Sequence, residues 1–221
     1  MNKFINALLL FFLFPTMFLT IFVGFDLPIE FLKVSGAQLP YRAEIFMGLG
    51  ILLLVINLRR SIRRWMGMRL VNQVAKFKWN RPMSKQRKQR IQVYTLMEAL
   101  VMFFVGSALY TITHEAIVPA IAFWFGTVDN IVFVIIGSMK DRFRGGITSK
   151  AVIIADRDVS LVYFSGLRKV SIHQDSIYFD YIKGLQLSFP VDCIEASHKD
   201  EFFAVLEDQI DPDKVFVTKV H

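Results

Sequence analysis

The amino-acid sequence predicts a membrane protein with a four-helix transmembrane region, followed by a cytoplasmic β-rich (α+β) domain that a C-terminal helix caps. Three observations predict this fold class. First, 54% of the residues are hydrophobic and 22 are Phe, a composition that is rare in soluble domains. Second, residues 59–92 carry twelve Lys or Arg residues and no acidic residue, between two apolar segments. Third, short runs rich in Val, Ile, Tyr and Phe alternate with turn residues after Gly145-Gly146.

The four expected spans are apolar segments that comprise residues 4–25, 43–58, 93–113 and 117–139. A hydrocarbon core of about 30 Å needs about 20 helical residues, and the short second span can extend into Arg59-Arg60. A cleaved signal peptide does not explain the first span. That span exceeds an h-region of about 7 to 15 residues, and no A-x-A-like cleavage site follows it. Only residues 114–116 separate the last two spans, which predicts a tight antiparallel hairpin.

The positive charges predict the orientation, because the cytoplasmic loops of membrane proteins collect Lys and Arg. The basic segment, defined as residues 59–92, is therefore expected on the inside. Lys140, Arg142 and Arg144 return a positive cluster to the same side after the fourth span. This arrangement places both termini in the cytoplasm.

Within the basic segment, apolar residues recur every four positions, which predicts an amphipathic helix lying at the inner membrane surface. This stripe consists of Ile62, Met66, Leu70 and Val74. Pro82 is expected to end that helix, and Ser84 is expected to cap a second helix that runs into the third span.

The cations of the basic segment are the candidate lipid-binding residues, since each Lys or Arg near a membrane attracts anionic lipid by about 1 kcal/mol. They are Arg59, Arg60, Arg63, Arg64, Arg69, Lys76, Lys78, Arg81, Lys85, Arg87, Lys88 and Arg90. An orienting signal alone is the alternative interpretation, although fewer cations would suffice for orientation. Nucleic acid is disfavoured as a partner, because a helix lying against anionic lipid already has its counter-charge.

Charge is distributed unevenly along the chain. The expected transmembrane region, residues 1–144, holds 18 basic and 7 acidic residues, whereas the expected cytoplasmic domain, residues 145–221, holds 8 basic and 12 acidic residues. An acidic domain tethered beside the basic segment is attracted to it. This pattern suggests the hypothesis that the cytoplasmic domain and anionic lipid compete for the basic segment.

Three polar residues within the spans are further candidates, namely Glu98, Asp129 and Asn130. A charged group at such depth needs a partner or an aqueous path. Antiparallel pairing of the last two spans brings Glu98 to within roughly one helical turn of Asp129 in depth. The two carboxyl groups either share a proton or a cation, as in a small oligomeric transporter or channel subunit, or bond polar groups on neighbouring helices as packing contacts.

The C-terminal residues have the pattern of a β-rich domain that begins at a hinge formed by Gly145-Gly146. The expected strands are residues 151–155, 159–165, 167–173, 177–181, 185–189 and 191–195. A helix is expected at about residues 198–210, because acidic residues in its first turn precede apolar residues at helical spacing. The strands are expected to form a strongly bent antiparallel sheet that this helix closes at one end.

Residues 150–210 carry this strand rhythm and end with the sequences Leu187-Ser-Phe-Pro-Val191 and Phe202-Phe-Ala-Val-Leu206. In these features the stretch resembles the bacterial pleckstrin-homology-like (PH-like) domains, which several small bacterial membrane proteins attach to transmembrane helices. The resemblance implies a module that binds lipid or protein rather than an enzyme. The better-known members of the family bind through a basic pocket between early strands, which the acidic composition here does not favour, so no binding residue is carried over.

The pattern contains no catalytic or metal-binding motif. Cys193 is the only cysteine, which excludes a disulfide within the chain and a multi-cysteine zinc site. The four histidines lack the spacing of metal ligands. We therefore expect no catalytic residue, cofactor or metal. The sequence predicts a non-enzymatic scaffold or regulatory accessory subunit that binds anionic lipid, together with a protein partner or further copies of itself.

Overall fold

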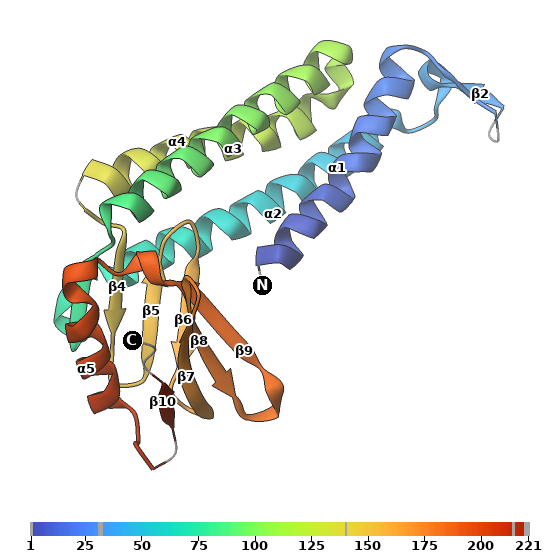
Figure 1. The fold of residues 1–221 in the computed structure, drawn as a ribbon. Coiled ribbons are helices and arrows are strands. Elements are labelled where there is room, and N and C mark those ends of the chain that lie inside the picture. Colours follow the sequence, from blue (N-terminus) through green and yellow to red (C-terminus); the bar gives the residue numbers. More distant parts are fainter. Residues whose placement is uncertain (1, 31–32, 140, 214, 219–221) are drawn as a thin grey trace. The chain divides into compact units, whose positions relative to one another are not determined.

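The computed structural model describes residues 2–30, 33–139, 141–213 and 215–218. Its elements, drawn in Figure 1, form two compact units that are described in turn. The first unit comprises Met1–Ile62 and Tyr94–Phe133, and the second comprises Arg63–Val93 and Val134–His221. Lys140, part of the positive cluster expected after the fourth span, lies outside the described residues.

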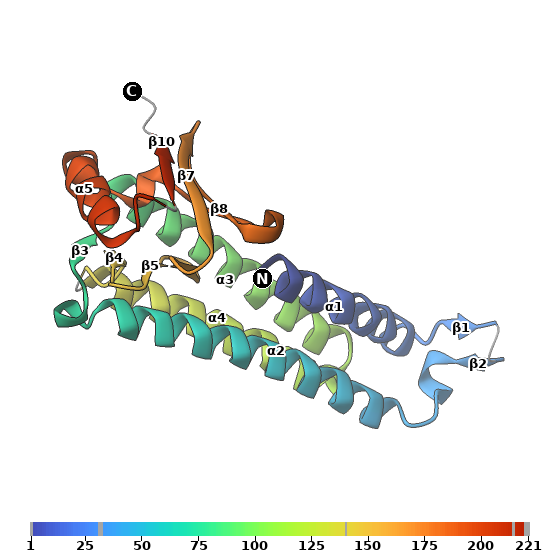
Figure 2. The ribbon, with the colours of Figure 1, turned by 90° about the horizontal axis from the view of Figure 1, so that it is seen from below.

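Within the described residues, four helices are long and apolar enough to cross a membrane, as predicted. They are α1 (Asn2–Gly24), α2 (Arg42–Val71), α3 (Lys85–Ile112) and α4 (Ile117–Met139). Figure 2 shows that a small antiparallel hairpin of β1 (Pro28–Ile29) and β2 (Val34–Ser35) connects α1 to α2. One turn of 3-10 helix, His114–Ala116, joins α3 to α4, which confirms the predicted tight connection.

The first unit buries some apolar side chains between its helices and leaves many others exposed. Phe46 and Leu53 of α2 are buried in one cluster with Phe123 of α4. On α1, by contrast, Phe11 and Phe14 are 69% and 61% exposed. Large exposed aromatic side chains are unfavourable in water, whereas lipid is a matching solvent for them. The helices therefore present the kind of outer surface that a bilayer accommodates.

Helix α2 is longer than the predicted second span, because it continues unbroken from Arg42 to Val71. The amphipathic helix predicted within the basic segment is therefore not a separate element. Its residues up to Val71 are the last turns of α2, and a 3-10 turn at Val74–Lys76 follows. The arginines after Leu58 are good helix formers, and no proline interrupts them, so the helix propagates past the apolar span.

The described part of the second unit contains two four-stranded sheets. One has the strand order β3-β4-β5-β6 and consists of Trp79–Pro82, Arg144–Ile147, Ala151–Ala155 and Val159–Tyr163. The other has the order β10-β7-β8-β9 and consists of Phe216–Thr218, Leu167–His173, Ser176–Tyr181 and Gln186–Pro190. Among the described residues, the strand pairs of this unit are antiparallel except for β10 with β7. The predicted β-rich region is thus confirmed, although it forms two sheets rather than one.

Strands β5 to β9 follow the predicted runs closely. Residues 191–195 were expected as a strand, but they begin with the 3-10 turn Val191–Cys193, so that prediction is wrong. The sequence interpretation also missed β3, β4 and β10. Pro82, expected to end a helix, is the last residue of β3. Proline is tolerated there because β3 is the edge strand of its sheet.

The Gly145-Gly146 pair lies within β4 and is not a hinge, which corrects the sequence interpretation. A Cβ atom on Gly145 would lie 2.8 Å from Cδ1 of Ile154, and one on Gly146 would lie 2.4 Å from Cδ1 of Phe77. The two glycines therefore let neighbouring side chains pack directly over the strand. Their role is close packing rather than flexibility.

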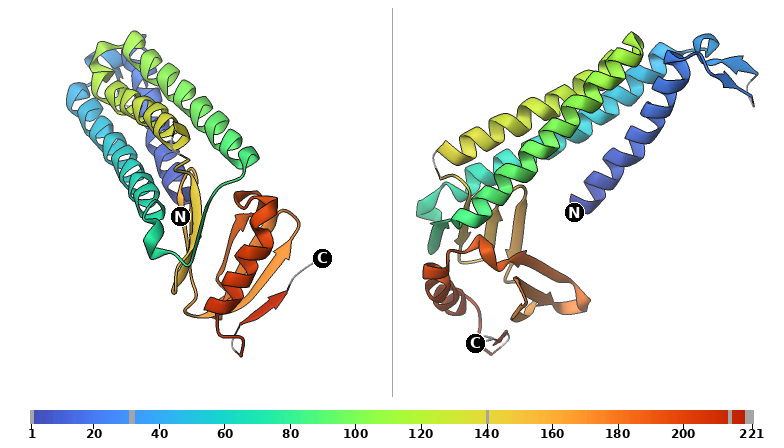
Figure 3. Two further views of the ribbon diagram at one scale, coloured as in Figure 1. Left: turned by 90° about the vertical axis from the view of Figure 1, so that its left-hand side faces the viewer. Right: turned by 45° about the horizontal axis from the view of Figure 1, so that its top comes forward.

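Helix α5 (Lys199–Gln209) confirms the predicted C-terminal helix and lies alongside the strands of the second unit (Figure 3). Phe202 of this helix is fully buried, and its ring packs edge-on against Phe189 of β9 and Trp79 of β3. Because Trp79 belongs to the basic segment, that segment contributes to the same apolar core as the C-terminal residues.

Candidate functional site

The first candidate site is the junction between the N-terminus of α3 and the turn after β9. The Ser84 hydroxyl oxygen accepts a hydrogen bond from the backbone N–H of Arg87 at 3.1 Å, which is the capping contact predicted from the sequence. The same hydroxyl donates to the backbone carbonyl of Asp192 at 2.6 Å. Ser84 therefore both starts α3 and attaches it to the turn that follows β9.

Arg87 is the central cation of this junction. Its guanidinium forms ion pairs with Asp156 and with Asp192, the latter at 3.5 Å between Nη1 and Oδ1. These three side chains are only 16 to 18% exposed. Arg90 binds the second carboxylate oxygen of Asp192 at 2.8 Å. Charges that are largely shielded from water are costly unless they are paired, so the cluster is a specific contact rather than a solvated charged face.

Two further ion pairs, which are more exposed to solvent, join the basic segment to acids outside it. Arg81 contacts Glu201 of α5 at 3.1 Å, and Lys88 contacts Asp141 at 2.5 Å. The hydrogen bond from Arg81 holds the pKa of Glu201 below its ordinary value, and the bond from Lys88 does the same for the pKa of Asp141. Exposed pairs of this kind add little stability. Their importance is that they occupy cations of the basic segment.

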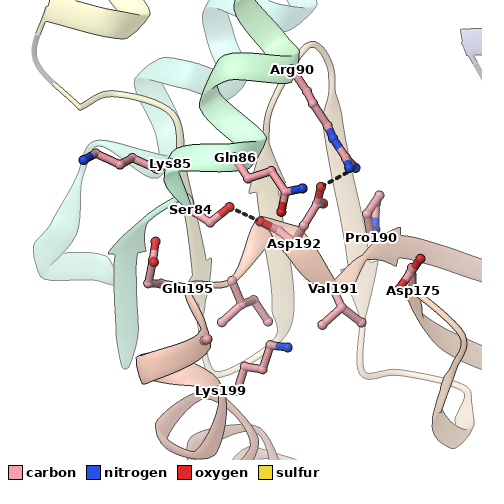
Figure 4. A pocket seen from close by; sticks show the side chains of 12 residues that line it. Ser84, Lys85, Gln86, Arg90, Asp175, Pro190, Val191, Asp192, Glu195 and Lys199 are labelled. Carbon is pink, nitrogen blue, oxygen red and sulfur yellow. Dashed lines mark hydrogen bonds and ion pairs between the residues drawn. The ribbon is translucent and has the colours of Figure 1, made fainter.

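A pocket of about 500 Å³ lies beside the junction (Figure 4). The charged residues that line it are Lys85, Arg90, Asp175, Asp192, Glu195 and Lys199. Figure 4 shows that the backbone carbonyl of Asp192 accepts a hydrogen bond from the Ser84 hydroxyl and that the Asp192 carboxylate binds Arg90. Because three cations and three anions share the lining, the pocket does not select an ion of either sign.

The structure divides the twelve predicted lipid-binding cations into groups. Five form ion pairs with acids outside the basic segment, namely Arg60, Arg81, Arg87, Lys88 and Arg90. Arg64 is buried, with 3% of the residue exposed. Within the part of the chain that the structure describes, the other six form no ion pair, and these are Arg59, Arg63, Arg69, Lys76, Lys78 and Lys85. These six cations remain open to an anionic ligand.

The second candidate site lies in the first unit, where α2 presents polar side chains to acids of α3 and α4. The Arg60 guanidinium forms a two-point ion pair with Glu98 of α3, and its Nη2 lies 2.7 Å from Oε2. The Ser61 hydroxyl donates a hydrogen bond to Oδ1 of Asp129 on α4 at 2.9 Å. Consecutive residues of α2 thus contact the two acids that the sequence singled out.

Two asparagines add polar contacts between the same helices. Asn57 of α2 donates to the backbone carbonyl of Ala122 on α4 at 3.2 Å. Asn130, the third predicted residue, is 2% exposed and lies 3.7 Å from the sulfur of Met102 on α3. Polar contacts of this type commonly link transmembrane helices.

Sequence reasoning identified Glu98 and Asp129 but missed their partners on α2. Arg60 and Ser61 lie just beyond the predicted end of the second span, so the sequence interpretation left them in the basic segment. The unbroken helical sequence from the second span through Val71 is the signal that would have placed both residues on that helix, but it does not indicate which acids they contact. Because each acid contacts a different residue of α2, the arrangement has the interhelical links that the packing interpretation requires.

Cys193 is the thiol that the sequence offers as a nucleophile. Cys193 is buried, and burial raises the pKa of its thiol, so the reactive thiolate does not form near neutral pH. Among the residues described by the structure, no group of three His, Cys, Asp or Glu side chains is arranged to hold a metal ion.

Comparisons of the chain with known protein families, with curated proteins and with solved structures found no match.

Proposed function

We propose that this chain is a non-enzymatic scaffold or regulatory accessory subunit of a membrane. In this proposal the four helices span a bacterial-type inner membrane, and both termini lie in the cytoplasm. The basic segment binds anionic lipid headgroups. The β-rich C-terminal region holds part of the basic segment and binds a protein partner or a further copy of the chain.

The observation that carries the proposal is the division of charges within the basic segment. Arg81, Arg87 and Arg90 pair with acids of the C-terminal region, while six other cations stay open to lipid. An arginine that is bound to Asp192 or Glu201 is not available to a lipid phosphate. The ion pairs therefore set how strongly the basic segment attracts an anionic membrane.

The fold and the helix surfaces support the same function. Two sheets followed by a closing helix are compatible with the resemblance to PH-like domains, which serve as binding modules. The apolar side chains exposed along α1, such as Phe11 and Phe14, suit a lipid environment. The positive charges that follow the second and fourth spans support a cytoplasmic position for the basic segment.

Neutralising the acids that hold the basic segment is expected to strengthen lipid binding. A triple variant, Asp156→Asn, Asp192→Asn and Glu201→Gln, releases three arginines. At about 1 kcal/mol for each released cation, the variant should bind phosphatidylglycerol about ten-fold more tightly or better at low salt, and less so at high salt. Native mass spectrometry of the full-length protein in mild detergent measures this, since it counts bound lipids, bound proteins and subunits together.

The matched control removes three exposed carboxylates that have no contact with the basic segment among the described residues, through Asp200→Asn, Asp208→Asn and Asp213→Asn. Equal lipid affinity in the two triple variants would contradict the competition. Circular dichroism checks that both variants fold. Glu201→Gln alone releases Arg81 without leaving a buried charge unpaired, so it should strengthen lipid binding by a smaller factor. This single variant provides the test if the triple variant is unstable.

A transporter or channel subunit is the alternative function. We expect Asp129→Asn to leave proton flux into sealed vesicles at the wild-type level, because asparagine keeps an oxygen that accepts the hydrogen bond from Ser61. A pH-sensitive dye inside vesicles that contain the purified protein reports the flux, and protein-free vesicles give the background. Flux above background in the wild type that the substitution removes would favour the transporter instead.

A further inference from the structure

An apolar groove lies in the second unit between the last turns of α2 and strand β6. Its volume is about 380 Å³, which is within the range of small-ligand sites. Apolar lining comes from Met66, Leu70, Val159 and Leu161, and two arginines, Arg63 and Arg69, also line it. The groove therefore combines an apolar surface with positive charge.

Close contact at Gly67 positions the two elements that form the groove. A Cβ atom on Gly67 would lie 1.7 Å from Cγ2 of Val159, so α2 approaches β6 as closely as only a glycine allows. Beside this contact, Met66 is 65% exposed and Leu161 is 39% exposed. An apolar groove that is open to water is unfavourable, and it suits a ligand with an apolar part.

Polar groups of the lining indicate the chemistry of that ligand. Within the described residues, neither Arg63 nor Arg69 forms an ion pair, so both guanidinium groups are open to an anion. The side-chain oxygen of Gln73, which also lines the groove, is buried and has no hydrogen-bond partner among the described residues. A ligand with an anionic group, a hydroxyl donor and an apolar portion would satisfy all three features.

The position of the groove along α2 matches the depth of lipid headgroups. At about 1.5 Å per residue, Arg63 lies about 31 Å along the helix from Arg42, the first residue of α2. This distance is close to the hydrocarbon thickness of about 30 Å, and the headgroup layer adds about 5 to 8 Å on each side. If α2 crosses a bilayer, Met66 therefore lies about 6 Å beyond the hydrocarbon core, within the headgroup layer, and Leu70 lies about 12 Å beyond the core, just past that layer.

We propose that this groove binds one anionic phospholipid of the membrane leaflet. The phosphate contacts Arg63 and Arg69, and the glycerol backbone and first methylene groups lie against Met66 and Leu161. This inference rests on the proposed lipid-binding function and names the place where the basic segment takes its lipid. Exposed cations outside the groove, such as Lys76, then contribute only general attraction.

Removing the two arginines tests the groove directly. Full-length protein in detergent is titrated with phosphatidylglycerol and the bound lipid is counted by native mass spectrometry. Arg63→Gln with Arg69→Gln should weaken binding by about 10- to 30-fold, since each cation contributes about 1 kcal/mol. Leu161→Glu, which lies outside the basic segment, should weaken binding by about ten-fold, because it places an acid in the apolar lining. The matched control, Lys76→Gln with Lys78→Gln, removes two exposed cations of the same segment that do not line the groove, so solvent screens them from the lipid bound there and its binding should change by less than about three-fold.

The outcomes separate this inference from the function on which it rests. If phosphatidylglycerol binding falls only in the arginine double variant and in Leu161→Glu, the lipid binds in the groove as proposed. An equal loss in the arginine and lysine pairs, with no effect of Leu161→Glu, overturns the groove but leaves lipid binding by the basic segment in place. No loss in any variant overturns both. Thermal unfolding identifies a variant that fails to fold. If Leu161→Glu fails to fold, the comparison of the arginine and lysine double variants tests the groove.

Discussion

Replacing Phe202 by alanine is expected to lower the free energy of unfolding of the second unit by about 3 to 5 kcal/mol. The side chain is fully buried, and its ring lies 5.1 Å from that of Trp79 and 6.3 Å from that of Phe189. Alanine would leave a cavity where α5 meets strands of both sheets, and the surrounding rings can only partly fill it. Because Trp79 lies in the basic segment, the loss should loosen that segment together with the C-terminal region.

Limited proteolysis at increasing urea concentrations measures this loss of stability on the full-length protein in detergent. Cleavage within residues 72–84 and within residues 145–221 should appear at the same, lowered urea concentration. Phe216→Ala is the matched control, because Phe216 is 69% exposed and its loss should change stability by no more than about 0.5 kcal/mol. Cleavage of the C-terminal region alone in Phe202→Ala would contradict a shared core.

Replacing Gly50 by alanine is expected to lower the stability of the first unit by about 1 to 3 kcal/mol, and by more if the helices cannot adjust. A Cβ atom there would lie 2.6 Å from the backbone nitrogen of Pro119 and 2.7 Å from the carbonyl carbon of Val118. Backbone atoms of α4 cannot rotate away as a side chain can. Helices α2 and α4 would have to separate, which weakens the van der Waals packing that holds helices together in lipid.

Gly48 provides the control for this substitution, because it lies on the same helix and a Cβ atom there would meet nothing within 4 Å. Gly48→Ala should therefore be neutral, or stabilising by up to about 1 kcal/mol through helix propensity. Thermal unfolding of both variants in the same detergent gives the comparison. Equal melting temperatures would show that α2 and α4 do not approach one another at Gly50.

The sequence predicted the elements whose signal lies within one run of residues. The four long helices are apolar over enough consecutive residues to be recognised without a partner. Strands β5 to β9 and helix α5 carry their own periodicity or β-branched content. Strand β4 was missed because its Gly145-Gly146 pair is typical of a flexible turn. It is a strand because it pairs with β3 and β5, and its glycines admit the side chains of Ile154 and Phe77.

The candidate sites were predictable only in part, for the same reason. Glu98 and Asp129 are acidic residues within apolar spans, and this position alone predicted that each needs a partner. The partners themselves, Arg60 and Ser61, come from another helix, and their own neighbours in the sequence give no indication of these contacts. The charge partition likewise predicted attraction between the C-terminal region and the basic segment, but not that Arg87 is the residue at its centre.

By itself, the sequence determined that this protein has four helices able to cross a membrane, a strongly basic segment between the second and third, and a β-rich end with a final helix. The tertiary structure decided which segments meet: Trp79 pairs with Ile147, Arg87 with Asp156 and Asp192, and Gly67 packs on Val159. Hydrophobic length and periodicity are properties of adjacent residues, so they can be read along the chain. Strand pairing, ion pairs and grooves depend on residues far apart in sequence, whose contacts only the folded chain creates.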